Sequence, residues 1–557
     1  MSDVERQIGV LAAGAVAWSR RTAAERAALA VRTTQTVAAV ADAWVEAALG
    51  IKQSPAAHVR AEETATGPLV TLRLLLVTAR ALGDIGRTGL PQVPRPPRLV
   101  HPGDGTASRI VVDVLPGSAP RGGLYDSTIF GGHQATVRCV NPGSLEAFER
   151  SWRAEVEERP RAGGVALVLG AGNVTGLAPA DCVNQIFEHG RAVFLKLHPV
   201  HAPLRGVFER AFQPLIEAGL LAIVAGGVEV AKAALAAPGL EHVHLTGGQA
   251  AFDALVWGGA GTHGTPVLAQ SITCELGNVT PWVIVPGRYT PRELAMQADM
   301  VAASIVNNTS FNCIATKLVV TARAWEQRTE FLALVERRLA AVAARPAWYP
   351  GARSAWEELT ASAAPADGTL PYVFRAGIDA DRDSRFVARE WFVPVAAEIP
   401  LDGDSIEAFC GAVHDLVGRL PGSLAASVTV PGSLASHDAA RTELLIEHLP
   451  FGVVGVNTWS ALAYSMASVP WGGFPGGTLA APKSGIGFVH DPLFLPLVHN
   501  SILRGPLTAW PKPAWFPWHA HGATLARGLL ATYTEIAHGR SGLLSLARMV
   551  PAVMLTR

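Results

Sequence analysis

Hydrophobic and polar positions follow two different periods along the first half of the chain. Over residues 4–50, alanines and leucines recur at helical spacing, and Thr22 with Glu25 three residues later matches a capping box. Over residues 163–248, short apolar runs alternate with amphipathic segments of roughly 10–15 residues. The first pattern predicts helices. The second predicts a parallel sheet covered by helices on both faces, and such sheets bind ligands at the carboxyl ends of their strands.

The elements of the alternating region are expected in a fixed order. Strands are predicted within residues 163–173, 191–199, 220–227 and 241–248, and helices within 179–190, 202–219 and 229–237. Further strands are predicted within 107–117, after the turn that follows Phe130, and within 273–277. Residues 86–105 are rich in proline and glycine, so they are predicted to form a loop.

Composition narrows the class of protein. A chain of 557 residues is long enough for two or three domains. Its formal net charge is zero and only 17% of its residues are charged, which argues against nucleic acid as a partner. Hydrophobic residues make up 49%, but no apolar run reaches the roughly 20 residues of a membrane-spanning helix. The first residues lack the apolar segment of a signal peptide, so a cytoplasmic protein is expected. Its apolar excess is predicted to lie in subunit contacts or against an apolar substrate.

The five cysteines suggest neither metal binding nor a disulfide framework. They are Cys139, Cys182, Cys274, Cys313 and Cys410. The sequence contains no CxxC pair and no cluster of cysteines with histidines, so no metal site is predicted. A single buried cysteine is usually a small core hydrophobe, and only Cys313 has neighbours that indicate chemistry.

The stretch from Thr273 to Lys317 carries that chemistry. Glu275 supplies a carboxylate that can activate water, and Cys313 supplies a thiol that can attack a carbonyl. Because side chains alternate along a strand, Cys274 and Glu275 point to opposite faces, so Cys274 is predicted to be core. Together the carboxylate and the thiol predict a covalent acyl-transfer site.

The segments around both residues resemble the aldehyde dehydrogenase superfamily. There a Glu-Leu-Gly-Gly segment carries the general base and a Gly-Gln-x-Cys segment carries the nucleophile. The resemblance implies that Cys313 is the nucleophile, that Glu275 is the base, and that Asn173, after the first strand, holds the oxyanion. The chain departs from the pattern at Asn278, which replaces a glycine, and at Phe311, which follows Ser310 where the family has Gly-Gln.

The same resemblance implies NAD or NADP as cofactor. Lys196 would bind ribose hydroxyls, the strand end Thr246-Gly247-Gly248 would meet the pyrophosphate, and Gly277 would leave room beside it. Glu390 would bind the nicotinamide ribose, and Phe392 would pack beside the nicotinamide. Pro199 stands where the family often has a glutamate that favours NAD. NADP is therefore predicted to be accepted with NAD still usable, and Arg205 is a candidate to meet the 2′-phosphate.

The expected fold class is α/β, with a parallel-sheet cofactor domain, an α/β catalytic domain and a small β oligomerisation element. The cofactor domain is predicted at residues 1–125 and 160–272, and the catalytic domain at 273–468. The oligomerisation element is predicted at 126–159 and 469–500, followed by a C-terminal extension at 501–557. In the family a hairpin near Phe130–Cys139 pairs with a neighbouring subunit, which implies a homodimer or homotetramer.

The predicted function is NAD(P)-dependent oxidation of an apolar aldehyde to a carboxylate, through a thiohemiacetal and a thioester on Cys313. Two alternatives stay open: an acylating enzyme that passes the thioester to coenzyme A, and a catalytically inactive scaffold. The extension carries Trp510, Trp515, Phe516 and Trp518. It could line a substrate mouth, cover a subunit or touch a membrane surface, but an apolar strap between domains is the preferred interpretation.

Overall fold

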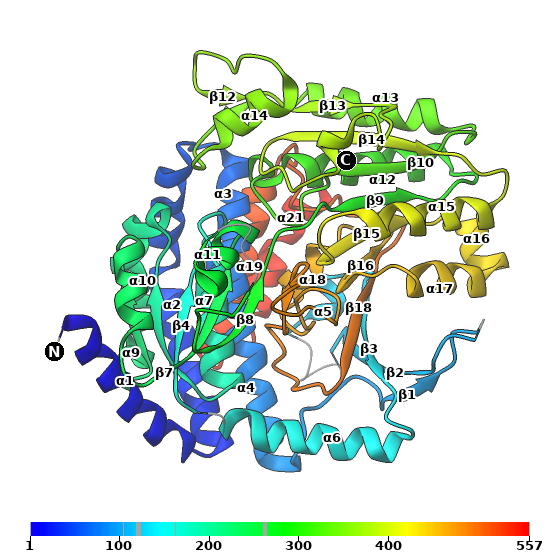
Figure 1. Cartoon of the computed structure of the whole chain (residues 1–557). Helices are drawn as coiled ribbons and strands as arrows, with labels where there is room; N and C mark the ends of the chain where they lie inside the picture. The colour runs from blue at the N-terminus through cyan, green and yellow to red at the C-terminus, as the bar shows by residue number, and fades with distance from the viewer. Residues whose placement is uncertain (1, 104, 118–123, 162, 260–263, 556–557) are drawn as a thin grey trace.

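Two sheets organise the molecule (Figure 1). The computed structural model describes residues 2–103, 105–117, 124–161, 163–259 and 264–555. The smaller sheet has six strands in the order β17-β8-β7-β4-β5-β6, and the larger has ten in the order β1-β2-β3-β18-β16-β15-β9-β10-β14-β13. Strands β11 (Arg345–Pro346) and β12 (Thr369–Leu370) form a separate pair. The expected α/β class is confirmed.

The six-stranded sheet comes from the alternating region. Its strands are β4 (Val165–Leu169), β5 (Ala192–Lys196), β6 (Leu221–Val224), β7 (Leu240–Thr246), β8 (Ser271–Glu275) and β17 (Gly485–Ile486). Strands β8, β7, β4, β5 and β6 pair in parallel, and β17 pairs with β8 in the antiparallel sense. Helices of this region are α7 (Leu177–Val183), α10 (Val228–Leu235) and α11 (Gln249–Trp257), with the π-helix η3 (Asn184–Glu188) continuing α7. The sequence predicted this parallel arrangement.

One predicted helix is broken. Residues 202–219 were expected as one element, but the chain forms the 3₁₀ helix η4 (Pro199–Leu204), then α8 (Arg205–Ala211) and α9 (Gln213–Glu217). Pro214 lies in the first turn of α9, where its missing N–H costs no helical hydrogen bond. The prolines therefore start new helical segments instead of extending one helix.

The ten-stranded sheet combines a parallel half with an antiparallel half. Its strands are β1 (Arg98–Val100), β2 (Arg109–Leu115), β3 (Gln134–Val140), β9 (Pro281–Ile284), β10 (Leu318–Ala322), β13 (Val373–Arg375), β14 (Val395–Leu401), β15 (Ala425–Thr429), β16 (Val453–Val456) and β18 (Val498–Arg504). Strand β1 corrects the loop predicted for 86–105. It is an exposed edge strand of three residues that pairs with β2, a long-range contact that local composition does not reveal.

The hairpin region near Phe130 pairs within its own chain. Strand β3 pairs with β2 on one side and with β18 on the other, both antiparallel. Strand β18 then pairs in parallel with β16, which joins these strands to the parallel half of the sheet. Both hydrogen-bonding edges of β3 are thus used inside one chain, whereas the resemblance had implied pairing with a neighbouring subunit.

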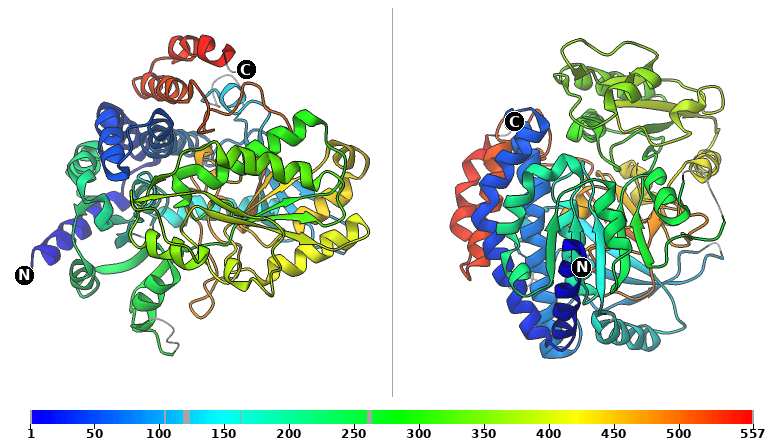
Figure 2. Two further views of the ribbon diagram at one scale, coloured as in Figure 1. Left: turned by 90° about the horizontal axis from the view of Figure 1, so that it is seen from above. Right: turned by 60° about the vertical axis from the view of Figure 1, so that its left-hand side comes forward.

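Helices from both ends of the chain pack side by side on one flank (Figure 2). They are α2 (Ala23–Lys52), α3 (Ala57–Thr64), α4 (Val70–Thr88) and, from the extension, α19 (Gly522–Ala537), α20 (Leu543–Arg548) and α21 (Val550–Met554). Helix α1 (Asp3–Ser19) packs instead against β5 and α10. The predicted capping box of Thr22 and Glu25 is present at the start of α2. Helix α19 contacts α2, α3 and α4, while Trp515 packs on Trp459 with ring centroids 5.0 Å apart. The extension therefore straps the helical flank to the residues after β16.

The remaining helices cover the larger sheet and its connections. They are α5 (Asp126–Ile129), α6 (Leu145–Glu158), α12 (Pro291–Val306), α13 (Arg328–Ala340), α14 (Ala352–Thr360), α15 (Ile406–Arg419), α16 (Gly432–His437), α17 (Ala439–Glu447) and α18 (Leu462–Met466). Within the described part of the chain, no helix has the length and apolar character needed to cross a membrane. The same described residues contain no group of three or more histidine, cysteine or acidic side chains placed to hold a metal ion.

Candidate active site

A cavity of about 1100 Å³ lies at the carboxyl ends of β4, β5, β7 and β8. Every catalytic and cofactor-binding residue predicted from the sequence lines it. These residues are Asn173, Lys196, Thr246, Gly247, Gly248, Glu275, Gly277, Cys313, Glu390 and Phe392. They come from both sheets and from segments more than two hundred residues apart, so the fold brings together what the sequence had only placed in separate motifs. This volume is called the central cavity below.

The thiol and the carboxylate of the central cavity are in contact. Cys313 Sγ lies 3.5 Å from Glu275 Oε1, the geometry in which the thiol donates to the carboxylate. Burial, together with the charges of Glu275 and Glu390, raises the pKa of the Cys313 thiol. Burial and the nearby Asp181 charge raise the pKa of Glu275 to about 7. Cys274 faces the other way, into an apolar cluster with Leu245 and Phe252.

A left-handed turn brings Cys313 to the cavity. Asn308, Thr309 and Ser310 have φ values of 52°, 57° and 62°, a conformation that costs L-residues roughly 1–2 kcal/mol each. The buried Lys317 holds the turn: its Nζ donates to the Ser310 carbonyl (3.0 Å), to the Ser310 hydroxyl (2.7 Å) and to the Val393 carbonyl (3.1 Å). Burial lowers the pKa of Lys317 to about 7. This lysine is a positioning residue for the nucleophile.

The predicted oxyanion donor is tied to the same turn. Asn173 Nδ2 donates to the Phe311 carbonyl at 3.2 Å, and the Asn173 carbonyl accepts from Asn308 Nδ2 at 3.0 Å. Asn308 Oδ1 in turn accepts from the buried Lys52, which pairs with Glu63. The side-chain amide of Asn173 thus bonds the backbone two residues before Cys313. This bonding fixes the Asn173 side chain beside the segment that carries Cys313.

Glu390 and Gly277 fit each other closely on the opposite wall. A side-chain carbon on Gly277 would lie 2.2 Å from Glu390 Oε2, so only glycine leaves the carboxylate its place. The Asn278 N–H donates to Glu390 Oε1 at 3.3 Å, and burial raises the pKa of Glu390 to about 7 against the opposing charge of Lys317. Phe392 stacks on Phe311 with ring centroids 6.3 Å apart.

The strand end of β7 forms the other wall. Gly248 precedes α11, and the space where its side chain would lie is open. The nine-residue helix α11 therefore presents its N-terminus to the cavity without a side chain in the way, which suits a phosphate group. Lys196 also lines the wall, and burial lowers its pKa. These features fit a dinucleotide in both size and chemistry.

Arg205, the candidate from the sequence for a 2′-phosphate contact, does not line the central cavity. Arg205 bonds Glu209 at 2.8 Å, and both side chains are about half exposed on α8. Among the described residues that line the central cavity, the cations are Lys196 and Lys232, with the imidazole of His198 beside Pro199. The sequence missed Lys232 because its position on α10 becomes relevant only once that helix is placed against the cavity.

Other residues of the site also escaped the sequence. Tyr349 lines the cavity beside Phe392, with ring centroids 5.1 Å apart, and it comes from a loop about forty residues away in the chain. Asp181 on α7 acts on Glu275 through its charge. Neither residue belongs to a motif, so no sequence signal pointed to either. Lys317 lay inside the nucleophile segment, where its spacing from Cys313 was the available signal.

Solved structures resemble this fold over most of its length, although no protein-family model matches the chain and no curated protein matches it in sequence. An NAD-dependent aldehyde dehydrogenase from Sinorhizobium meliloti is 16% identical, with a TM-score of 0.58 over 90% of this chain and 86% of that one. A betaine aldehyde dehydrogenase from Staphylococcus aureus in complex with NAD⁺ is 15% identical, with a TM-score of 0.60 over 90% and 86%. A glyceraldehyde-3-phosphate dehydrogenase from Methanocaldococcus jannaschii complexed with NADP is 11% identical, with a TM-score of 0.60 over 90% and 94%. The chain therefore has the aldehyde dehydrogenase fold.

Proposed function

We propose that the protein oxidises an aldehyde to a carboxylate with NAD or NADP. The observation that carries this proposal is the contact of 3.5 Å between Cys313 Sγ and Glu275 Oε1 in a cavity of dinucleotide size. A buried thiol beside a carboxylate with a raised pKa can lose its proton at the moment it attacks a carbonyl. The likeness to dehydrogenase structures solved with NAD⁺ or NADP supports the same assignment.

The residues of the chain divide the work. Cys313 attacks the aldehyde carbon while its thiol proton passes to Glu275, which releases that proton to solvent before it acts on water. Asn173 with the Cys313 backbone N–H stabilises the oxyanion, a contribution of about 10²–10³-fold in rate per donor. When bound, the nicotinamide ring supplies the hydride acceptor that converts the thiohemiacetal into a thioester. Glu275 then takes a proton from water, the hydroxide attacks the thioester carbon, and the Cys313 thiolate leaves as the carboxylic product forms.

The cavity walls provide the remaining contacts. In this proposal Glu390 and Lys196 bond ribose hydroxyls and the N-terminus of α11 meets the pyrophosphate, and the position of these groups on the cavity wall supports these roles. Lys196 and Lys232 supply positive charge near Pro199, where a carboxylate would repel a 2′-phosphate. We therefore propose that NADP is accepted alongside NAD.

Purified protein incubated with an aldehyde panel and either cofactor tests the proposal. Absorbance at the wavelength of reduced nicotinamide should rise, most strongly with apolar aldehydes, and coenzyme A should leave the rate unchanged. A rate that depends on coenzyme A would assign the acylating reaction instead. No reduction of either cofactor by any aldehyde, with the protein folded and the cofactor bound, would leave the scaffold interpretation.

A further inference from the structure

A row of polar side chains runs through the interior between β7 and β8. The two strands pair in parallel with direct register, so side chains at alternate positions share one face. On this face every position that is paired between the two strands is polar, from an exposed serine at one end to the predicted catalytic carboxylate at the other. The aligned pairs are His242 with Ser271, His244 with Thr273, and Thr246 with Glu275. This row is called the polar ladder below.

Hydrogen bonds connect the outer half of the ladder without a break. His242 Nδ1 lies 2.8 Å from the Ser271 hydroxyl, and His242 Nε2 lies 2.9 Å from the Thr273 hydroxyl. The same Thr273 oxygen lies 2.9 Å from His244 Nδ1. Each of these imidazoles therefore uses both ring nitrogens, and Thr273 joins them through one atom. Ser271, at the end, is exposed and donates to the Glu241 carbonyl at 3.2 Å.

The inner half ends at a buried carboxylate on α7. His244 Nε2 lies 3.4 Å from Asp181 Oδ1, and the Thr246 hydroxyl donates to Asp181 Oδ2 at 2.9 Å. Asp181 and His244 are each only 1% exposed. Burying a polar group without a partner costs roughly 1–3 kcal/mol. Breaking any hydrogen bond of this buried row would therefore be unfavourable, which keeps the row connected.

The buried hydroxyl of Tyr464, on α18, lies in the electrostatic reach of both carboxylates. Burial, followed by the charges of Asp181, Glu275 and Cys313, raises the pKa of Tyr464. Its ring packs on Trp471, 5.4 Å away, and on His490, 4.5 Å away. Among the described residues, neither the Tyr464 hydroxyl nor His490 Nε2 has a hydrogen-bond partner. Orphaned buried polar atoms of this kind can accommodate ordered water or an exchangeable proton.

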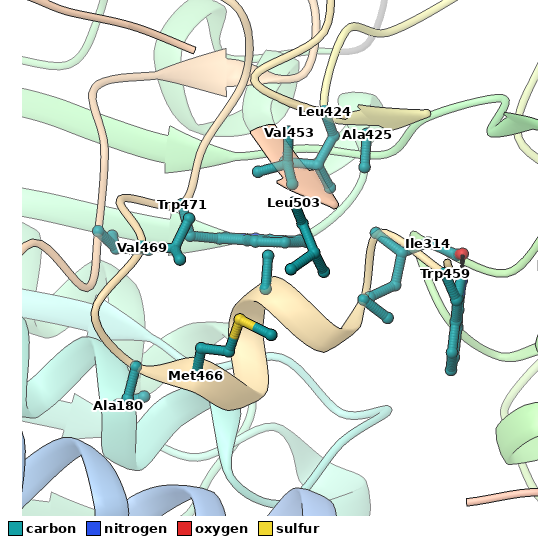
Figure 3. Packing of buried hydrophobic residues seen from close by; sticks show 14 of the residues in the cluster. Ala180, Ile314, Leu424, Ala425, Val453, Trp459, Met466, Val469, Trp471 and Leu503 are labelled. Carbon is teal, nitrogen blue, oxygen red and sulfur yellow. Dashed lines mark hydrogen bonds between the residues drawn. The ribbon is translucent and has the colours of Figure 1, made fainter. Parts of the chain in front are cut away.

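The indole of Trp471 closes the other side of this region. It belongs to the apolar cluster with Val453, Leu503 and Met466 (Figure 3). Its N–H lies beside the Glu275 carboxylate and lowers the pKa of Glu275. Burial raises the same pKa by more, so the net shift is upward. The cluster thus separates Glu275 from solvent on that side, so a proton on Glu275 that does not return through the central cavity needs a polar way out.

We propose that the polar ladder is this way out: it carries the proton that Glu275 takes from water to the surface at Ser271. The inference rests on the proposed function, because it assigns Glu275 as the base of thioester hydrolysis. Tyr464 is the first carrier, Asp181 the second, and the two histidines with Thr273 the remainder. These residues position and move a proton without contacting the substrate carbon.

The transfer balances at every atom. Protonated Glu275 gives its proton to the Tyr464 oxygen. At the same time the original O–H bond of Tyr464 breaks, and that proton passes to Asp181. Asp181 protonates His244 Nε2 while His244 Nδ1 releases its proton to the Thr273 oxygen. Thr273 passes its own proton to His242 Nε2, His242 Nδ1 passes one to Ser271, and Ser271 releases one to solvent. One proton leaves, both carboxylates end ionised, and each imidazole ends neutral. Neutral rings suit the site, since burial holds the pKa of His242 at about 3.

Thr273→Val tests the ladder at its single joining atom, because it keeps the shape of the side chain and removes the hydroxyl. Stopped-flow mixing with an aldehyde and cofactor, followed with a pH indicator dye, measures proton release to solvent. We expect the burst of reduced cofactor to match wild type and proton release to slow about 10-fold, below the 10²–10⁴-fold contribution of a general base itself. Imidazole in the buffer should restore the rate, and Thr273→Ser should behave as wild type.

A matched control makes the same exchange elsewhere. Thr34, on α2, is buried and donates to the Ala30 carbonyl of its own helix, so Thr34→Val should change neither phase. A folded Thr273→Val protein that releases protons at the wild-type rate, with no response to imidazole, would overturn the proposal. If wild type itself reduces neither cofactor with any aldehyde, the proposed function has failed instead, and the two failures are therefore distinguishable.

Tyr464→Phe tests the entrance of the ladder. The Tyr464 hydroxyl has no partner among the described residues, so a purely structural role predicts that its removal leaves proton release unchanged and stability equal or higher. We expect slower proton release with a normal burst and no loss of stability. Unchanged proton release in this variant would remove Tyr464 from the path, and unchanged release in both variants would remove the path.

Discussion

Strands β4 and β7 lie side by side in the same sheet but bury very different faces. In β4, Val165, Leu167 and Leu169 share one face, and Ala166 and Val168 share the other, so both faces are apolar. In β7 one face carries Val243 and Leu245, while the other carries histidines and a threonine. A parallel strand covered on both faces is normally an apolar run, and β4 follows that rule. The polar face of β7 departs from it only where the sheet adjoins Glu275. Local sequence rules are usually broken at functional sites, so the polar face of β7 indicates a functional role.

The largest expected effect distinguishes Cys313, which contacts Glu275 at the end of β8, from Cys274, which lies on the apolar face of β8. Cys313→Ala removes the proposed nucleophile and should reduce aldehyde oxidation by at least about 10³-fold, since no other group can form the thioester. Cys274→Ala, on the apolar face next to Glu275, should keep turnover and lose only packing. Rates of cofactor reduction for the two purified variants check this. Full turnover in Cys313→Ala would show that the nucleophile lies elsewhere.

The next effect concerns the inner end of the polar ladder. Glu275→Gln keeps the shape of the side chain but cannot accept a proton from water. We expect a burst of reduced cofactor of about one equivalent, followed by a steady state slowed about 10²–10⁴-fold as the thioester persists. Mass spectrometry of the intact protein should find the acyl group on Cys313. A variant that binds cofactor yet gives no burst would move Glu275 out of deacylation and into activation of the thiol.

A third prediction tests the apolar strand of the comparison. Leu167, in β4, is fully buried in the main core. Leu167→Ala should lower the free energy of unfolding by about 2–5 kcal/mol, the cost of lost burial plus a cavity. Thr273→Val in the ladder should cost less, because it conserves volume and leaves only neighbouring imidazole nitrogens to find new partners. Denaturant unfolding of both variants measures the difference. A ladder variant that is as destabilised as Leu167→Ala would mean that the ladder is chiefly structural.

The sequence predicted the strands of this comparison better than it predicted how their side chains align. Strands were predicted within residues 241–248 and 273–277, and β7 (Leu240–Thr246) and β8 (Ser271–Glu275) overlap these ranges. That the two polar faces coincide depends on register between strands, which local patterns do not encode. The predicted site residues of the smaller sheet reached one cavity because they lie at or just after strand ends, and the ends of parallel strands share an edge. Cys313, Glu390 and Phe392 come from the segments before β10 and β14, and the packing of the two sheets brings them to the same cavity. Tyr349 and Tyr464 come from loops and short helices whose place is set by tertiary packing, so no periodicity or motif could have found them.

The last expected effect is a dependence of the free energy of unfolding on pH. Glu275, at the inner end of the polar ladder, should produce it, whereas the apolar strand β4 should not. The pKa of Glu275 is about 7 in the folded protein, against 4.5 when it is solvated. Because the folded state holds this proton more tightly, the stability that it confers is fully present below pH 4.5 and is lost as the pH rises to about 7. Glu275→Gln has no such loss, so it should be more stable than wild type at pH 8 by about 3 kcal/mol, and the advantage should shrink towards zero near pH 4.5. Glu25→Gln gives the opposite sign as a control, since hydrogen bonds at the start of α2 hold the pKa of that exposed carboxyl down at about 2. Denaturant unfolding across this pH range measures both variants. An advantage of Glu275→Gln that does not change with pH would show that Glu275 ionises as easily in the fold as in water, and its burial between Asp181 and Cys313 would then have no electrostatic consequence.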